Sequence, residues 1–192
     1  MSREARANRH WKDNRMNTAT LTERHLTLFG AIVHSYARHE LLMQRIMARA
    51  IGADGSAVIL LTRTMTFTQK RDALLALLRH RRVPLDQVDA IRDCLKLPSR
   101  MRMLCDDIKH SDWTAGASTD SIQPAWIFNR STTIKALHRT PDTSSADFME
   151  DDDDRTEYTL DELTVITENL TENYAAFHDF ASETHLIEDG AL

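Results

Sequence analysis

Along residues 20–51, hydrophobic positions recur at spacings of three and four, the pattern of an α-helix that buries one face. The stripe consists of Phe29, Ile32, Val33, Tyr36, Glu40, Met43, Met47 and Ala50. Thr20 or Thr22 can cap the start of this helix, and Gly52 stands where a left-handed terminating residue is expected. At 1.5 Å per residue the helix is about 48 Å long, so we expect it to be the spine of the domain.

Shorter stretches with the same periodicity follow, and prolines at 84 and 98 separate several of them. They predict helices over residues 56–63, 69–82, 85–95 and 99–110. A last helix is expected from Thr159, which forms a capping box with Glu162, to about Ala181.

Residues 111–158 lack helical periodicity, and their two β-prone runs, 125–129 and 132–138, flank a polar turn. Five Gly and four Pro are few for an all-β chain. The expected fold class is therefore all-α: an antiparallel bundle of four to six helices, with an irregular or small β-hairpin insertion before the last long helix.

The chain of 192 residues has the length of one domain with tails. We expect a flexible basic arm over 1–19, a single helical domain over 20–183 with its insertion at 111–158, and a tail over 184–192. The insertion includes an acidic loop, 141–154, which ends in five consecutive acidic residues, 150–154.

Charge is unevenly distributed along the chain. Residues 1–112 hold 20 Lys and Arg against 12 Asp and Glu, whereas residues 113–192 hold 4 against 17. The basic half could contact an anion such as nucleic acid, or the acidic half could cover it within the molecule or across a dimer. A pI near 6.0 argues against a dedicated duplex-DNA binder.

Several protein classes are disfavoured by composition. No run of 18 apolar residues is present, and no signal-peptide pattern follows the basic N-terminus, so neither a membrane partner nor secretion is expected. Cys94 and Cys105 fit neither a metal pair nor a disulfide framework, which favours reduced thiols in the cytoplasm. Phosphate-loop, nucleophile-elbow and dinucleotide motifs are absent from the sequence, and Asp107-x-x-His110 has no second metal-binding partner, so we expect no cofactor and no metal.

Candidate chemistry lies in the helix over 99–110. Arg102, Asp106 and His110 are four residues apart in succession, so they share one strip of the helix. Arg102 could pair with Asp106, and Asp106 could fix the tautomer of His110, placing a phosphate-binding group beside an acid–base group. The alternative is an exposed, salt-bridged helix face.

A second candidate is a basic cluster that could follow a nucleic-acid backbone, or could be a solvated helix face. It consists of Arg63, Lys70, Arg71, Arg79, Arg81 and Arg82.

His110-Ser111-Asp112-Trp113, preceded by residues 106–109, resembles the Arg-Asn-x-x-x-His-Gly-x-Trp segment of HEPN-like helical proteins. Residues 30–33, Glu40 and residues 158–163 fall in a similar order, and the resemblance covers about residues 25–182. It implies a helical homodimer, often part of a toxin–antitoxin, antiphage or stress module. In active members an Arg and a His from each protomer meet in a cleft and cleave RNA without a metal.

This chain departs from that motif, because Cys105 falls at the position of the Arg and Asp106 at that of the Asn. Arg102 lies one helical turn earlier, and Glu40 either faces the His110 helix or is a satisfied residue of the bundle. A thiol cannot neutralise phosphate as a guanidinium does. The expected function is a HEPN-like homodimeric module of a prokaryotic or phage defence or stress system, binding RNA or a protein partner, with endoribonuclease activity weak or lost. The alternative is a non-enzymatic interaction or inhibitor module, whose acidic loop engages a basic partner.

Overall fold

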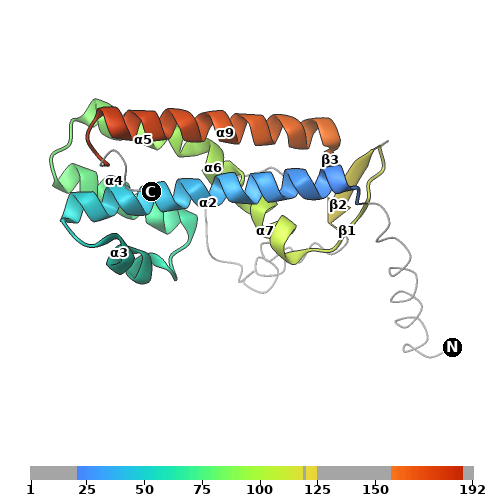
Figure 1. Ribbon diagram of the computed structural model, residues 1–192, viewed down its shortest axis with the longest axis horizontal. Helices are drawn as coiled ribbons and strands as arrows, with labels where there is room; N and C mark the ends of the chain where they lie inside the picture. The colour runs from blue at the N-terminus through green and yellow to red at the C-terminus, as the bar shows by residue number, and fades with distance from the viewer. Residues whose placement is uncertain (1–20, 119, 125–156, 188–192) are drawn as a thin grey trace, which may run out of the picture. The chain divides into compact units, whose positions relative to one another are not determined.

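A computed structural model describes residues 21–118, 120–124 and 157–187 of the chain (Figure 1). Seven helices and three strands lie within these ranges. They are α2 (Glu23–Ile51), α3 (Gly55–Thr62), α4 (Phe67–His80), α5 (Leu85–Cys94), α6 (Lys96–Arg100), α7 (Arg102–His110), β1 (Trp113–Ala115), β2 (Ser121–Pro124), β3 (Tyr158–Thr159) and α9 (Leu160–Glu183). The predicted arm over 1–19, the β-prone runs over 125–138, the acidic loop over 141–154 and the end of the tail lie outside the described residues.

The described residues form two compact units. The sheet unit contains residues 21–29, 106–124 and 157–163, apart from residue 119, and the helical unit contains residues 30–105 and 164–187. Helices α2, α7 and α9 each continue from one unit into the other. The single domain over 20–183 stays a prediction.

The helix ends follow the capping signals in the sequence. The Thr66 hydroxyl accepts from the Gln69 backbone N–H at 3.3 Å, and the Gln69 side chain accepts from the Thr66 N–H at 2.8 Å. The predicted capping box of Thr159 and Glu162 forms in the same way, with distances of 3.2 and 2.9 Å. Gly52 ends α2 with φ of +68°, a conformation that costs glycine little. The predicted capping box of Thr159 and Glu162 and the predicted end of α2 at Gly52 are confirmed.

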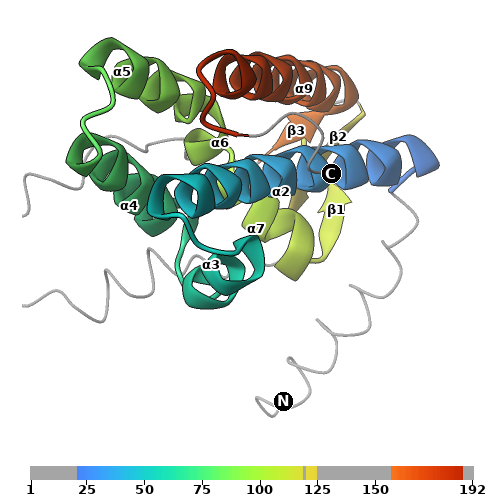
Figure 2. The same ribbon diagram turned by 60° about the vertical axis from the view of Figure 1, so that its left-hand side comes forward.

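In the helical unit, contacts define the directions of the helices. Tyr36 of α2 packs on Phe67 of α4, and further along both helices Glu40 meets Lys70. α2 and α4 therefore run in the same direction, as do α2 and α9, which lie side by side in Figures 1 and 2. The short turn after α4 reverses the chain, so α5 is antiparallel to α4. The predicted helical bundle is confirmed; α4 and α5 are antiparallel, whereas α2, α4 and α9 share one direction.

Apolar side chains from α2, α4, α5 and α9, with Leu95 between α5 and α6, fill the core of the helical unit. Fully buried members, all less than 2% exposed, are Ile32, Leu42, Met43, Ile46, Leu74, Leu78, Ile91, Leu95, Leu170 and Phe177. Removing such side chains from water is the main source of stability for a bundle. Among the described helices, none combines the length and hydropathy that crossing a membrane requires.

The sheet unit is built on three short antiparallel strands in the order β1-β2-β3. Trp113 pairs with Pro124, and Ile122 pairs with Tyr158. The Trp113 ring packs against Phe29 at a centroid distance of 4.7 Å and against Tyr158 at 6.2 Å. The small β insertion before the last long helix is therefore confirmed.

A carboxylate holds the β1–β2 turn of this unit. Glu157 accepts from the Ser118 backbone N–H at 2.7 Å and from the Ser121 hydroxyl. Hydrogen bonds from Ser121 and then Ser118 lower the pKa of Glu157 to about 2.

Candidate nucleic-acid interface

Helix α7 places Arg102, Asp106 and His110 on one strip, as their spacing predicts. Arg102 is half-buried, and Asp106 and His110 are exposed. The Asp106 carboxylate lies 4.0 Å from the ammonium of Lys109. Among the described residues, neither Arg102 nor His110 comes within ion-pair or hydrogen-bond distance of Asp106, so the predicted relay of guanidinium, carboxylate and imidazole is not formed along α7.

Cys105, at the position where the HEPN-like motif has its arginine, has no exposed surface. A side chain at this position therefore points into the protein and not toward an RNA phosphate. The adjacent Asp107 is half-buried, and its pKa is raised first by desolvation and then by the charge of Asp106. A buried thiol at 105 followed by a carboxylate at 106 offers no positive charge to a phosphate at these two positions.

Glu40, the fourth predicted catalytic residue, forms an ion pair in the helical unit. The ammonium of Lys70 donates to its carboxylate at 3.0 Å, with side-chain exposures of 8% for Lys70 and 27% for Glu40. Glu40 is thus a satisfied bundle residue, one of the two roles expected for it. The same contact takes Lys70 out of the exposed basic surface.

The rest of the predicted basic cluster lies on or next to α3 and α4. Arg71 contacts Asp72 at 2.9 Å and the Ser99 hydroxyl at 3.3 Å, and Arg81 donates to the carbonyl of Ala50. Arg63, Arg79 and Arg82 are exposed.

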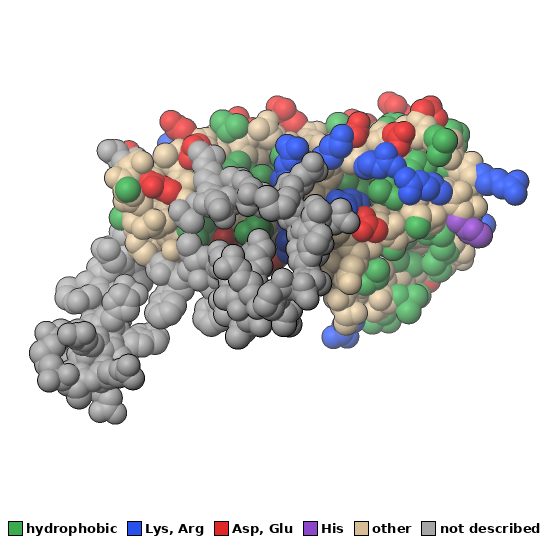
Figure 3. Space-filling view, turned by 180° about the vertical axis from the view of Figure 1, so that it is seen from behind, with side chains coloured by type: hydrophobic (Ala, Val, Ile, Leu, Met, Phe, Trp, Pro, Cys, Tyr) green, Lys and Arg blue, Asp and Glu red, His purple; other side chains and the backbone are tan. Residues whose placement is uncertain are grey.

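Figure 3 shows Lys and Arg side chains grouped near the end where α4 and α5 lie, with acidic side chains among them. Arg92 pairs with Asp89, and Lys96 pairs with Asp93 at 2.6 Å. Much of the positive charge on this face is therefore neutralised locally.

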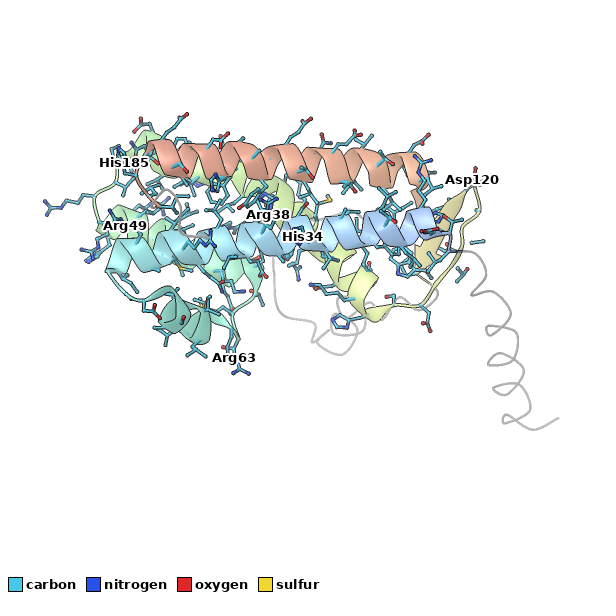
Figure 4. The ribbon with its side chains drawn as sticks, viewed as in Figure 1. His34, Arg38, Arg49, Arg63, Asp120 and His185 are labelled. Atoms are coloured by element: carbon cyan, nitrogen blue, oxygen red, sulfur yellow. The ribbon has the colours of Figure 1, made fainter. Side chains whose placement is uncertain are left out.

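A different basic surface runs along the solvent-facing side of α2. Positions 34, 38, 41, 45 and 49 lie within about 80° of one another at 100° per residue. We call this set the α2 stripe; it consists of His34, Arg38, Leu41, Arg45 and Arg49. Arg45 is half-buried and the others are exposed. Figure 4 labels three of these residues, which follow one another along α2.

Two arginines of the α2 stripe, unlike several cations of α4 to α6, have no carboxylate beside them. Among the described residues, no carboxylate lies within ion-pair distance of Arg38 or Arg45. Guanidinium groups in a row, such as Arg38 and Arg45 without a carboxylate beside them in the described part of the chain, produce a positive potential that attracts a polyanion. The stripe is therefore the stronger candidate for an anion-binding surface.

Helix α9 borders this surface with an aromatic ring. The guanidinium carbon of Arg38 lies 3.9 Å from the centroid of the Tyr174 ring, which is a cation–π contact. One turn further along α9, the imidazole of His178 lies 6.0 Å from the same ring, centroid to centroid.

A buried histidine supports Tyr174 from within the bundle. His39 has no exposed surface and meets Tyr174 edge-on at 5.4 Å. Its Nδ1 lies 2.8 Å from the carbonyl oxygen of Ser35, and its Nε2 lies 2.9 Å from Oδ1 of Asn173. Burial lowers the pKa of His39. The ring under Arg38 is therefore fixed by contacts to a rigid core group.

The acidic side chains of α9 lie mostly on another side of the helix. At 100° per residue, positions 168, 172, 179 and 183 are about 120–180° from Tyr174. His178 is flanked by Asp179, whose carboxylate lies 3.6 Å from its Nδ1. Thr167 and Thr171 lie on the same side as Tyr174, so the border of the α2 stripe along α9 is largely uncharged.

The hydrophobic pattern of α2 did not indicate the α2 stripe, because the stripe lies opposite the apolar face that this pattern marks. The signal was present: cationic or imidazole side chains at 34, 38, 45 and 49 recur with helical spacing. The contact of Arg38 with Tyr174 had no such signal, since 136 positions separate the two residues. Within the described parts of the chain, no group of His, Cys, Asp and Glu side chains is arranged to hold a metal ion.

Comparisons of the chain with protein-family models, with curated protein sequences and with solved structures found no match.

Proposed function

We propose that this protein is a helical RNA-binding module, which uses the α2 stripe and does not cleave the RNA. The observation that carries the proposal is the row of arginines on α2, free of neighbouring carboxylates at Arg38 and Arg45 and bordered by Tyr174. Basic grooves with aromatic side chains are typical of proteins that bind single strands without sequence preference. The stripe is about 22 Å long from position 34 to position 49, which allows contact with several nucleotides.

The proposal is tested by the salt dependence of binding to a labelled single-stranded RNA. If Arg38, Arg45 and Arg49 each neutralise a phosphate, log K against log salt has a slope of about −2. Replacing Arg45 and Arg49 by Ala should reduce this slope to about −0.7. The matched control replaces Arg79 and Arg82 of the α4 end by Ala, which should leave the slope unchanged. The opposite result, a loss confined to the α4 variant, would overturn the assignment to α2.

Absence of cleavage is supported by the buried thiol at position 105 and by the exposed carboxylate at position 106. The test incubates labelled RNA with the wild type and with His110→Ala in the presence of a chelator. Equal background cleavage is the expected result. Cleavage by the wild type that disappears in the variant would instead favour an active HEPN-like nuclease.

A second candidate function, self-association, is favoured by the exposed apolar side of α3. Ile59, Leu60 and Leu61 are 42%, 65% and 74% exposed, and the helix carries no charged residue. Two copies of such a helix can meet without like-charge repulsion, so the occupant proposed for this face is a second copy of the chain. Light scattering should report a dimer for the wild type and a monomer for Leu60→Gln/Leu61→Gln. A wild type that is monomeric at high concentration would exclude this function.

A further inference from the structure

We infer that Arg38 is a base-stacking residue, and that the ligand of the α2 stripe is a single-stranded nucleic acid with at least one unpaired base. This inference rests on the proposed RNA binding and adds the class of ligand and the residue that selects it. Phosphate contacts alone do not distinguish a single strand from a duplex or from any other polyanion. A planar surface that accepts a base does make that distinction, because the bases of a duplex are already stacked on one another.

The first step concerns how Tyr174 is held. Its ring meets the fully buried His39 edge-on, with an interplanar angle of 82°. His39 in turn is held by Ser35 on its own helix and by Asn173 on α9. A ring with such support presents a fixed plane, so little side-chain entropy is lost when another group stacks above it.

The second step concerns the group above the ring. The Cζ atom of Arg38 lies 3.9 Å from the Tyr174 centroid, a stacking distance, and the Arg38 side chain is exposed. Tyr174 lies against the guanidinium carbon, and because Arg38 is exposed, the guanidinium keeps surface that a ligand can reach. Arginine planes and aromatic rings are the two surfaces on which proteins stack unpaired bases, and here one lies on the other.

The third step concerns the neighbouring charges. Arg45 lies seven residues beyond Arg38 on the same stripe, about 10 Å along the helix, where it can contact the backbone of the same strand. Among the described residues, no aromatic ring lies under Arg45 as Tyr174 lies under Arg38. Arg38 and Arg45 therefore carry the same charge on the same helix side, and they differ in the platform beneath them.

This difference makes a matched pair of conservative variants. Arg38→Lys and Arg45→Lys both keep the positive charge, whereas lysine lacks the planar group that stacks on a base and on a ring. The ligands are a labelled 12-nucleotide RNA, and the same RNA annealed to its complement. Base stacking contributes about 1–3 kcal/mol per base. Arg38→Lys should therefore weaken single-strand binding at least about fivefold, and Arg45→Lys less than about twofold. Neither variant should change the affinity for the duplex by more than about twofold.

The outcomes separate this inference from the function on which it rests. If the wild type binds neither RNA, the proposed RNA binding itself fails. If the wild type binds with the expected salt dependence but the two lysine variants behave alike on the single strand, binding is through phosphate only, and the stacking role of Arg38 is overturned. A thermal unfolding midpoint within a few degrees of the wild type shows that either variant is folded. Arg38 is exposed and Arg45 is half-buried, and lysine keeps the charge and a similar length at both positions, so folding is expected.

Discussion

The imidazole of His39 and the amide of Asn173 face each other across α2 and α9, with Nε2 and Oδ1 2.9 Å apart. Because Nδ1 donates to the carbonyl of Ser35 at 2.8 Å, Nε2 is the position that changes with pH. The Asn173 amide can turn to donate to a neutral ring or to accept from an imidazolium. This pair joins the two long helices and lies beneath the ring that supports Arg38.

Stability should fall with acid because of His39. Burial lowers the pKa of His39 in the folded protein below its ordinary value of 6.5, so the unfolded chain binds the proton more readily. The stabilising contribution is complete above pH 6.5 and is lost as the pH falls below that value toward the folded-state pKa. Urea unfolding at pH 7.5 and pH 5.5 measures the loss, and His39→Gln should reduce it. As a control, the contribution of His39 to the free energy of unfolding should be nearly the same at pH 7.5 and pH 8.5. If His39→Gln loses as much stability as the wild type between pH 7.5 and pH 5.5, the prediction is contradicted.

A separate loss of stability is expected at lower pH from Glu157. Hydrogen bonds from Ser121 and Ser118 lower its pKa from 4.5 to about 2. The contribution is present above about pH 4.5 and disappears as the pH falls through 2. Thermal unfolding midpoints at pH 5 and pH 3 should therefore differ more for the wild type than for Glu157→Gln. Equal differences would show that the turn does not depend on this carboxylate.

Two glycines should respond oppositely to alanine. A Cβ on Gly116 would lie 2.6 Å from the Glu157 Oε1 atom and would also collide with the Ser121 hydroxyl. Gly116→Ala should therefore lower the free energy of unfolding by about 1–3 kcal/mol.

Gly30 is the matched control, because it lies in α2 and nothing approaches its Cβ position within 4 Å. Gly30→Ala should raise the free energy of unfolding by about 0.5–1 kcal/mol through helix propensity. Denaturant titrations of both variants measure the two effects, and a loss of stability in Gly30→Ala would contradict the described environment of α2.

The pair of Lys70 and Glu40 should show strong coupling. Glu40→Leu leaves the ammonium of Lys70, whose side chain is 8% exposed, without its counter-charge. Removing one partner of a buried ion pair lowers the free energy of unfolding by about 3–5 kcal/mol. Because Glu40 is 27% exposed, we expect a loss at or below the lower end of that range.

Replacing both residues, with Lys70→Met added to Glu40→Leu, should recover much of the lost stability, since no uncompensated charge remains. Chemical unfolding of the wild type, the two single variants and the double variant completes the cycle. Additive losses would mean that the two side chains do not interact in solution.

The sequence by itself determined most of the helical elements and their ends, although the single helix expected over 99–110 is divided between α6 and α7 at Met101. The capping pair of Thr159 with Glu162 acts over three residues, and Gly52 acts through its own backbone, so no distant part of the chain is needed to place them. Periodic apolar positions also identified the buried face of α2, because burial follows the repeat of the helix.

Only the tertiary structure decided which side chains meet. Lys70 reads as a surface cation in the sequence, yet it lies buried against Glu40, 30 positions away. Arg38 and Tyr174 stack although 136 positions separate them. Such contacts depend on the directions and rotations of whole helices, which are set by packing of the entire core and not by any local pattern. That is why the candidate interface lies on α2 and α9, whereas the sequence pattern pointed only to the basic cluster around α4.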